Sequence, residues 1–94
     1  MSLPKKMKLQ DIMIAKIREY CDEYGLSYSE LAGITGIPKS TITDYMTHAS
    51  KDMRLSTLVK LANGFNVTLR ELFEDERFDM IDMEDVMKIQ KRAK

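Results

Sequence analysis

Few side chains in this sequence are of the types that catalyse reactions or bind metals, and they lack the neighbours that such chemistry needs. Cys21 is the single cysteine, and its helical spacing from Ile17 and Tyr24 puts it on an apolar stripe without a basic partner to activate it. His48 has no second metal ligand near it in the sequence. The carboxylates between residues 74 and 85 are too interrupted for a calcium-binding loop. We therefore expect no enzyme activity, no cofactor and no metal site.

A polar stretch from Pro38 to about Thr47 offers a different chemistry, namely hydrogen bonding to a partner. Ile42 and Tyr45 are spaced to face a core on one side of a helix. Pro38 suits the first helical position, where its missing N–H costs nothing. The side chains left largely outward are hydrogen-bonding ones: Lys39, Ser40, Thr41, Thr43 and Asp44. The sequence thus predicts a short helix with one unburied polar face.

The preceding segment predicts the helix that must hold this polar helix in place. Ser27 and Glu30 form a Ser-x-x-Glu capping box, which opens a short helix over about residues 28–35. Gly36 ends it at a position where a β-carbon would be strained, and Ile37 makes the apolar contact in the turn. The residues expected to face the core are Leu31, Ala32 and Ile34. Two short helices joined by a tight glycine-centred turn are the helix-turn-helix layout.

Three further helices complete the predicted domain. The first spans about residues 9–24 and stops at Gly25. The fourth spans about residues 55–65. Thr68 and Glu71 form a second capping box, and the fifth helix that it opens carries Leu69, Leu72 and Phe73. Because the sequence has no convincing strand pattern, we expect an all-α bundle of five helices with short loops.

Composition and charge limit the class of protein. The chain has 94 residues, enough for one domain, and no apolar run approaches the ~18 residues of a membrane-spanning helix. An N-terminus without an apolar stretch and a single cysteine favour a cytoplasmic location. The 15 basic and 15 acidic residues cancel, and the excess of acidic residues lies in positions 74–94. A nucleic-acid partner would therefore be held by a few well-placed contacts.

The register of these residues resembles that of the phage-repressor-like (Cro/XRE-type) helix-turn-helix DNA-binding family. The resemblance covers about residues 9–73 and rests on Leu31-Ala32, Gly36-Ile37, Ser40-Thr41-Ile42, Leu58, Ala62, Phe65, Val67-Thr68 and Leu72-Phe73. It implies a five-helix repressor-like domain whose third helix enters the major groove of double-stranded DNA, usually as a homodimer on a two-fold operator.

By position, the resemblance also implies two sets of DNA-contacting residues. Base contacts are implied for Lys39, Ser40, Thr43 and Asp44. Lys39 would donate to guanine O6 and N7, whereas Asp44 would either accept from cytosine N4 or repel phosphate. Contacts to the DNA backbone, which position a protein without reading sequence, are implied for Tyr28, Thr47, Lys51 and Arg54. The alternative is that these are merely exposed or half-buried helix and loop residues.

The sequence departs from the family pattern at three places. Tyr28 stands where the family often has a phosphate-binding Gln. Met46-Thr47-His48 replaces a frequent Glu-Asn-Gly, and Met53 replaces a usual Pro. These departures affect the loop after the third helix, and its phosphate contacts, more than the fold.

Two segments flank the predicted domain at residues 9–73. Residues 1–8 form a basic N-terminal arm that either reaches DNA, as arms do in some family members, or is merely solvated. Residues 74–94 form a C-terminal extension in which Asp82 suits the cap of a sixth helix. Three alternatives remain for this extension: it packs on the domain through Phe78 and Ile81, it forms a dimerisation helix, or it is partly disordered. The residues of the dimerisation alternative are Met83, Val86 and Met87.

From these residues we predict a sequence-specific DNA-binding transcriptional regulator, a repressor that acts by promoter occlusion. The alternative is a protein-binding module, such as an antitoxin that neutralises a toxin partner through residues 74–94. The zero net charge and the methionines of the extension favour that alternative. The two functions do not exclude each other.

Overall fold

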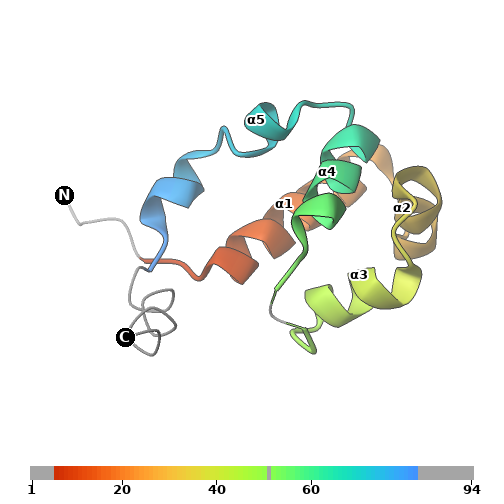
Figure 1. Ribbon diagram of the computed structural model, residues 1–94, viewed down its shortest axis with the longest axis horizontal. Coiled ribbons are helices and arrows are strands. Elements are labelled where there is room, and N and C mark those ends of the chain that lie inside the picture. The colour runs from red at the N-terminus through yellow and green to blue at the C-terminus, as the bar shows by residue number, and fades with distance from the viewer. Residues whose placement is uncertain (1–5, 51, 83–94) are drawn as a thin grey trace.

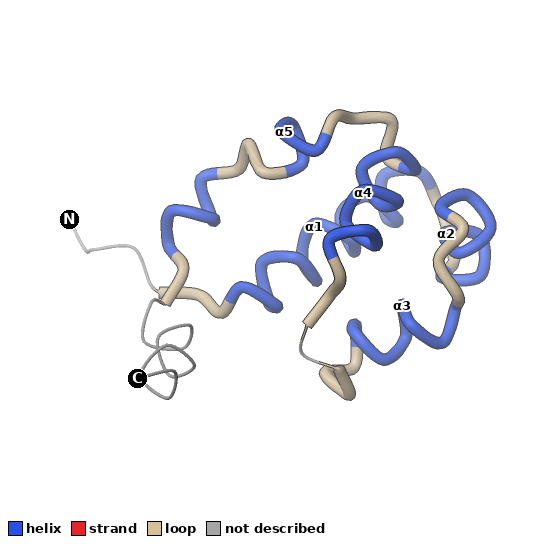
Figure 2. Tube along the Cα trace, in the orientation of Figure 1, coloured by secondary structure: helices blue, strands red, loops and turns tan. Residues whose placement is uncertain are grey.

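Five α-helices followed by a 3₁₀ helix form the domain (Figure 1). The computed structural model describes residues 6–50 and 52–82. The elements are α1 (Leu9–Tyr24), α2 (Tyr28–Thr35), α3 (Lys39–Met46), α4 (Leu55–Gly64), α5 (Leu69–Leu72) and the 3₁₀ helix η1 (Glu76–Met80). Figure 2 shows short loops between them and no strand in the part described. The prediction of an all-α, five-helix fold is confirmed, and no helix within the described ranges has the length and apolar character to cross a membrane.

Local signals in the sequence set the helix boundaries. Both predicted capping boxes form, since the hydroxyls of Ser27 and Thr68 accept from the N–H three residues on, and the Glu side chains there accept in return. Gly25 and Gly36 end α1 and α2 in the left-handed region, with φ of 62° and 78°, a conformation in which a side chain would be strained. Pro38 is the N-cap of α3 and thus lies one position before the helical position predicted for it.

One cluster of buried apolar side chains joins all five α-helices. Figure 1 shows α1 running between α3 on one side and α5 on the other. Ile34 is 51 % exposed, so the expectation that it faces the core is wrong. Thr35 takes the inward position at the end of α2 instead. The cluster includes Met13, Ile17, Cys21, Leu31, Ile37, Ile42, Tyr45, Met46, Leu61, Ala62, Phe65 and Leu72.

The close approach of α2 and α4 depends on Gly64. A β-carbon at this position would lie 2.5 Å from Cγ2 of Thr35, so any larger residue would push the two helices apart. The buried Thr35 hydroxyl donates to the Leu31 carbonyl (2.8 Å) and accepts from the Ile37 N–H (3.2 Å). The turn between α2 and α3 is therefore held by a satisfied polar side chain as well as by Gly36.

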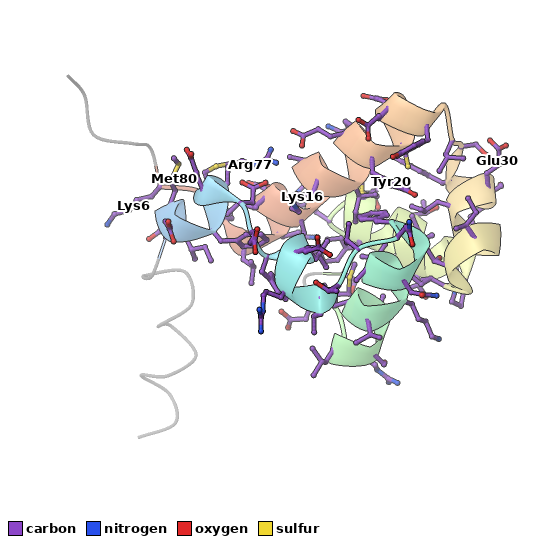
Figure 3. The ribbon with its side chains drawn as sticks, turned by 90° about the horizontal axis from the view of Figure 1, so that it is seen from above. Lys6, Lys16, Tyr20, Glu30, Arg77 and Met80 are labelled. Atoms are coloured by element: carbon purple, nitrogen blue, oxygen red, sulfur yellow. The ribbon has the colours of Figure 1, made fainter. Side chains whose placement is uncertain are left out.

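Segments from both ends of the described chain lie side by side at one end of the molecule, where Figure 3 labels Lys6 and Met80. The Met7 N–H donates to the Met80 carbonyl, and the Asp82 N–H donates to the Met7 carbonyl, both at 2.8 Å. Phe78 packs against the core cluster and meets the Phe73 ring edge-on at 5.2 Å between centroids. Residues 74–82 of the extension thus pack on the domain. The predicted sixth helix beyond Asp82, and arm residues 1–5, lie outside the described residues.

Candidate nucleic-acid interface

The two faces of α3 differ completely in character. Ile42, Tyr45 and Met46 are buried, with exposed fractions of 3 %, 4 % and 6 %. The opposite face carries exposed Lys39, Ser40, Thr41 and Asp44. A helix anchored by one apolar face, with its polar face on the protein surface, has the form required to enter a major groove ~12 Å wide.

Three of the four predicted base-contact residues are exposed on this polar face, namely Lys39, Ser40 and Asp44. Thr43 is half-buried, which corrects the expectation that it points largely outward. The face carries one positive and one negative charge, at Lys39 and Asp44. Since these charges offset each other, recognition by this face would depend on hydrogen bonds and shape more than on net attraction. That these residues contact bases stays a prediction.

The four predicted backbone contacts have different surroundings. Tyr28 is half-buried and packs against the core cluster. Thr47 is exposed, and its hydroxyl donates to the Thr43 carbonyl at 2.8 Å. Arg54 is exposed and is the N-cap of α4. Lys51 lies outside the described residues. The structure thus leaves Thr47 and Arg54 accessible to a phosphate, and their contacts stay predictions.

The described part of the chain has a groove of about 380 Å³ and another of about 420 Å³. The groove of about 420 Å³ lies directly beside α3. Thr41 and Asp44 line it from α3, and Arg54, Ser56 and Lys60 line it from the start of α4. No side chain caps the N-terminus of α4, and such a terminus favours anions. Ser56 and Lys60 are not among the residues predicted from the sequence to contact DNA. They are spaced by one helical turn shortly after Arg54, and this spacing could have indicated that they share its side of α4.

The loop after α3 is held from the first turn of α1. The side-chain amide of Gln10 donates to the carbonyls of Tyr45 (2.9 Å) and Ser50 (2.7 Å). Next to it, Asp11 contacts the Nε2 atom of His48 at 2.9 Å, and His48 has a left-handed φ of 64°. These contacts fix the segment in which the sequence departs from the family pattern, and they orient the end of α3.

A small helical domain in which a glycine-centred turn holds a polar helix at the surface is a helix-turn-helix domain. The family description of the Cro/C1-type HTH DNA-binding domain matches residues 16–77 of this chain. The chain belongs to this family, which is a family of DNA-binding HTH transcriptional regulators. The resemblance inferred from the sequence is therefore confirmed.

Two relatives agree with this assignment. The chain is 34 % identical over 76 residues to an HTH-type transcriptional regulator of Methanocaldococcus jannaschii, with 81 % of this chain and 41 % of the relative covered. It is 31 % identical over 58 residues to the SPbeta prophage-derived HTH-type regulator YopS of Bacillus subtilis, covering 62 % of this chain and 78 % of the relative. The chain thus spans less than half the length of the archaeal relative.

The similar solved structure is a complex of the proteins SinR and SinI. The match has a TM-score of 0.59 and 22 % sequence identity, and it covers 85 % of this chain and 77 % of that one. At this identity the match supports the fold alone.

Proposed function

We propose that this protein is a sequence-specific repressor that binds double-stranded DNA as a homodimer and blocks transcription by occupying a promoter. The observation that supports the proposal most is the exposed polar face of α3 opposite buried Ile42, Tyr45 and Met46. In this proposal α3 lies in the major groove with Lys39 toward base edges. Arg54 lies against a phosphate, and no catalytic step is involved.

Two exposed apolar side chains provide a surface for the second copy. Leu55 is 65 % exposed and Val59 is 50 % exposed. They lie one turn apart on α4, so both are on the same side of that helix. A single domain with no net charge gains little from general attraction to DNA. Two domains that bind half-sites ~34 Å apart would supply the missing affinity.

Promoter occlusion needs only that the dimer remain on the DNA. A bound dimer excludes polymerase by its own volume and requires no further contact surface. The proposal therefore places the whole regulatory effect in DNA affinity, and a variant that loses affinity should lose repression in proportion.

Selection of bound DNA from a random pool, at a stated salt concentration, tests this function. We expect enrichment of a site with two-fold symmetry. Lys39→Ala should then relax the preference at one base pair in each half-site, because it removes a contact to a base edge. Arg54→Ala serves as the matched control, since loss of its proposed phosphate contact should weaken binding to all sequences alike. Absence of any enriched sequence would refute the proposal.

The dimer is tested separately by sedimentation. Val59→Glu should shift the protein toward monomer and reduce DNA affinity, while circular dichroism shows unchanged helix content. Ser56 is an exposed residue that lines the groove between α3 and the start of α4. Ser56→Glu should therefore reduce DNA affinity without dissociating the dimer. If Val59→Glu leaves the dimer intact, this surface is not the dimer interface.

A protein-binding function is the second candidate. The similar solved structure is of SinR together with another protein, SinI. In this chain, Tyr24 at the end of α1 presents an aromatic ring that is 60 % exposed. If a protein partner binds this ring, Tyr24→Ser should abolish binding of the partner and leave DNA binding intact. Equal DNA and partner binding by this variant and by the native chain would exclude Tyr24 from the partner surface.

A further inference from the structure

A second groove, of about 380 Å³, lies between α1 and the α5–η1 segment. Aromatic rings form much of its lining. The Tyr20 ring stacks on Phe65 at 3.9 Å and meets Tyr24 at 4.7 Å between centroids. The Tyr20 hydroxyl donates to the Gly64 carbonyl at 2.8 Å, which fixes the central ring. Val67 and Leu72 add to this apolar lining. The groove therefore contains a preformed apolar part with one largely exposed ring, Tyr24.

The carboxylates that line this groove outnumber its cations, so some of them have no ion-pair partner. Lys16 and Arg77 are its two cations, and Figure 3 shows them along α1 with Tyr20. Lys16 pairs with Asp75 at 3.2 Å. Arg77 binds both Asp75 (2.7 Å) and Glu19 (2.8 Å). The remaining two carboxylates of the lining, Glu23 and Glu71, make no ion pair within the described chain, and Glu71 accepts only the capping-box hydrogen bond from the Thr68 N–H. A segment with apolar side chains and an excess of cations would thus match both the apolar lining and the excess of carboxylates in this groove.

The chain itself contains such a segment, residues 83–94. Its cations are Lys88, Lys91, Arg92 and Lys94, and its acids are Glu84 and Asp85, so it carries an excess of two positive charges. The groove carries an excess of two negative charges, from four carboxylates and two cations. The apolar residues of the segment are Met83, Val86, Met87, Ile89 and Ala93. Methionine adapts well to irregular apolar and aromatic surfaces.

We propose that residues 83–94 dock in the groove between α1 and the α5–η1 segment of their own chain. The apolar residues of the segment cover the Tyr20 and Tyr24 rings, and its cations face Glu23 and Glu71. Because α3 lies on the other side of α1 (Figure 1), the docked segment does not cover the DNA-binding face. The docking is therefore independent of the proposed repressor function, whereas a protein partner that binds Tyr24 would compete with the docked segment.

The position of Asp82 makes this docking possible within one chain. Asp82, two residues after η1, is hydrogen-bonded to Met7, which lies two residues before α1. Arg77 in η1 already lines the groove. The far end of the groove is at Tyr24, the last residue of α1. The 16 residues of α1 measure about 24 Å at 1.5 Å per residue. Twelve residues of extended chain reach up to about 40 Å, so residues 83–94 can span the groove.

Zero-length crosslinking of the full chain with a carbodiimide tests the docking, because the reagent joins a carboxylate to an amine only when they touch. We expect peptide mapping of the monomer fraction to show amide links from Glu23 or Glu71 to Lys88, Lys91 or Lys94. Glu23→Gln should remove its links, and 0.5 M salt should weaken all of them. Asp22→Asn is the matched control, since Asp22 is the exposed neighbour of Glu23 but does not line the groove.

Three outcomes would overturn the proposal. Links found only in a crosslinked dimer would mean that the segment of a second copy fills the groove. Links to Asp22 as frequent as those to Glu23 would show a segment without a fixed site. Absence of links would leave the groove to another occupant. As a second measurement, Met87→Ser should shift the NMR signals of Tyr24 and Val67 but not those of Ser40. Unchanged Tyr24 signals would also refute the docking.

Discussion

The helices α3 and η1 are both short and both pack on α1, but opposite kinds of interaction hold them there. Three buried side chains anchor α3, namely Ile42, Tyr45 and Met46. In η1 no residue is buried, and its docking depends on ion pairs at its start and on the half-buried Phe78. The helix proposed to bind DNA is therefore fixed by apolar burial, whereas the start of the C-terminal extension is fixed mainly by charges.

This difference predicts opposite responses to pH. Burial raises the pKa of Tyr45 to about 12. The stability that the Tyr45 anchor gives to α3 is therefore lost at alkaline pH. The Arg77 side chain, through its hydrogen bonds, lowers the pKa of Asp75 well below its usual range. Its hydrogen bonds to Glu19 also lower the pKa of that carboxyl. The contacts of η1 are therefore affected in acid. The helix proposed to bind DNA should stay in place over the whole range in which the extension can be loosened.

The largest effect in this comparison is expected from Ile42→Ala. Truncating a buried Ile leaves a cavity and costs about 2–5 kcal/mol of unfolding free energy, a large part of the stability of a small domain. Ile34→Ala is the matched control, because Ile34 is 51 % exposed on the preceding helix and should cost less than about 0.5 kcal/mol. Urea denaturation measures both. Equal costs would contradict an apolar anchor for α3.

The sequence could predict the part of the fold that depends on local interactions. The capping boxes at Ser27 and Thr68, and the left-handed glycines Gly25 and Gly36, act within a few residues of their own positions. Spacing in the sequence is therefore sufficient to find the ends of α1 and α2, and the start of α5. The polar face of α3 was predictable for the same reason, since Ile42 and Tyr45 define its buried side.

The part that could not be predicted depends on contacts between distant residues. The loop after α3 is held by Gln10, which lies 35 and 40 residues from its two acceptors. Arg77 and Glu19 are 58 residues apart. A 3₁₀ helix of five residues gives no periodicity to detect, so η1 was not foreseen. The prediction for Ile34 was wrong because α2 has only two turns, so a shift of one residue decides which side chain faces the core. The inward position belongs to Thr35 instead.

The contact from Gln10 extends the anchoring of α3 beyond its buried face. Gln10→Ala removes two hydrogen bonds to backbone carbonyls, each of which contributes about 1 kcal/mol. We expect a loss of about 1–2 kcal/mol in unfolding free energy and faster hydrogen exchange in residues 47–50. Asp11→Asn, at the next position, should change exchange less, because Asn can still meet His48. Unchanged exchange in Gln10→Ala would mean that the buried face alone positions the loop.

The alkaline side of the comparison is tested by Tyr45→Phe. Because the pKa of Tyr45 is raised in the folded state, its stabilising contribution is complete below pH 10 and is lost as the pH rises toward 12. The native chain should lose up to about 1.4 kcal/mol per pH unit from this group in that range, and the variant should lose less. Tyr24→Phe, at an exposed ring, is the control. Identical pH dependence of Tyr45→Phe and the native chain would contradict this account.

The acid side is tested at Asp75. A carboxyl with a lowered folded-state pKa stabilises above its unfolded pKa of about 4, and this contribution is lost as the pH falls toward the folded value. As the pH falls below about 4 we expect η1 to loosen, seen as faster hydrogen exchange in residues 76–80 while α3 stays protected. Asp75→Asn should cost about 1 kcal/mol at pH 6 and remove most of this change. Asp79→Asn, at an exposed η1 position, should leave the change intact.

The smallest effect should come from the outer ion pair of the same network. The Glu19 side chain is 61 % exposed, whereas that of Asp75 is 15 % exposed. Both accept from Arg77, but solvent screens the Glu19 pair. Glu19→Gln should therefore cost only about 0.2–0.5 kcal/mol at low salt and almost nothing at 0.5 M salt. If Glu19→Gln instead costs as much as Asp75→Asn, the paired hydrogen bonds from Arg77 to Glu19 hold η1 on α1 as strongly as the contacts of Asp75 do. Salt alone would then loosen the start of the extension, while α3 stays anchored by its buried face.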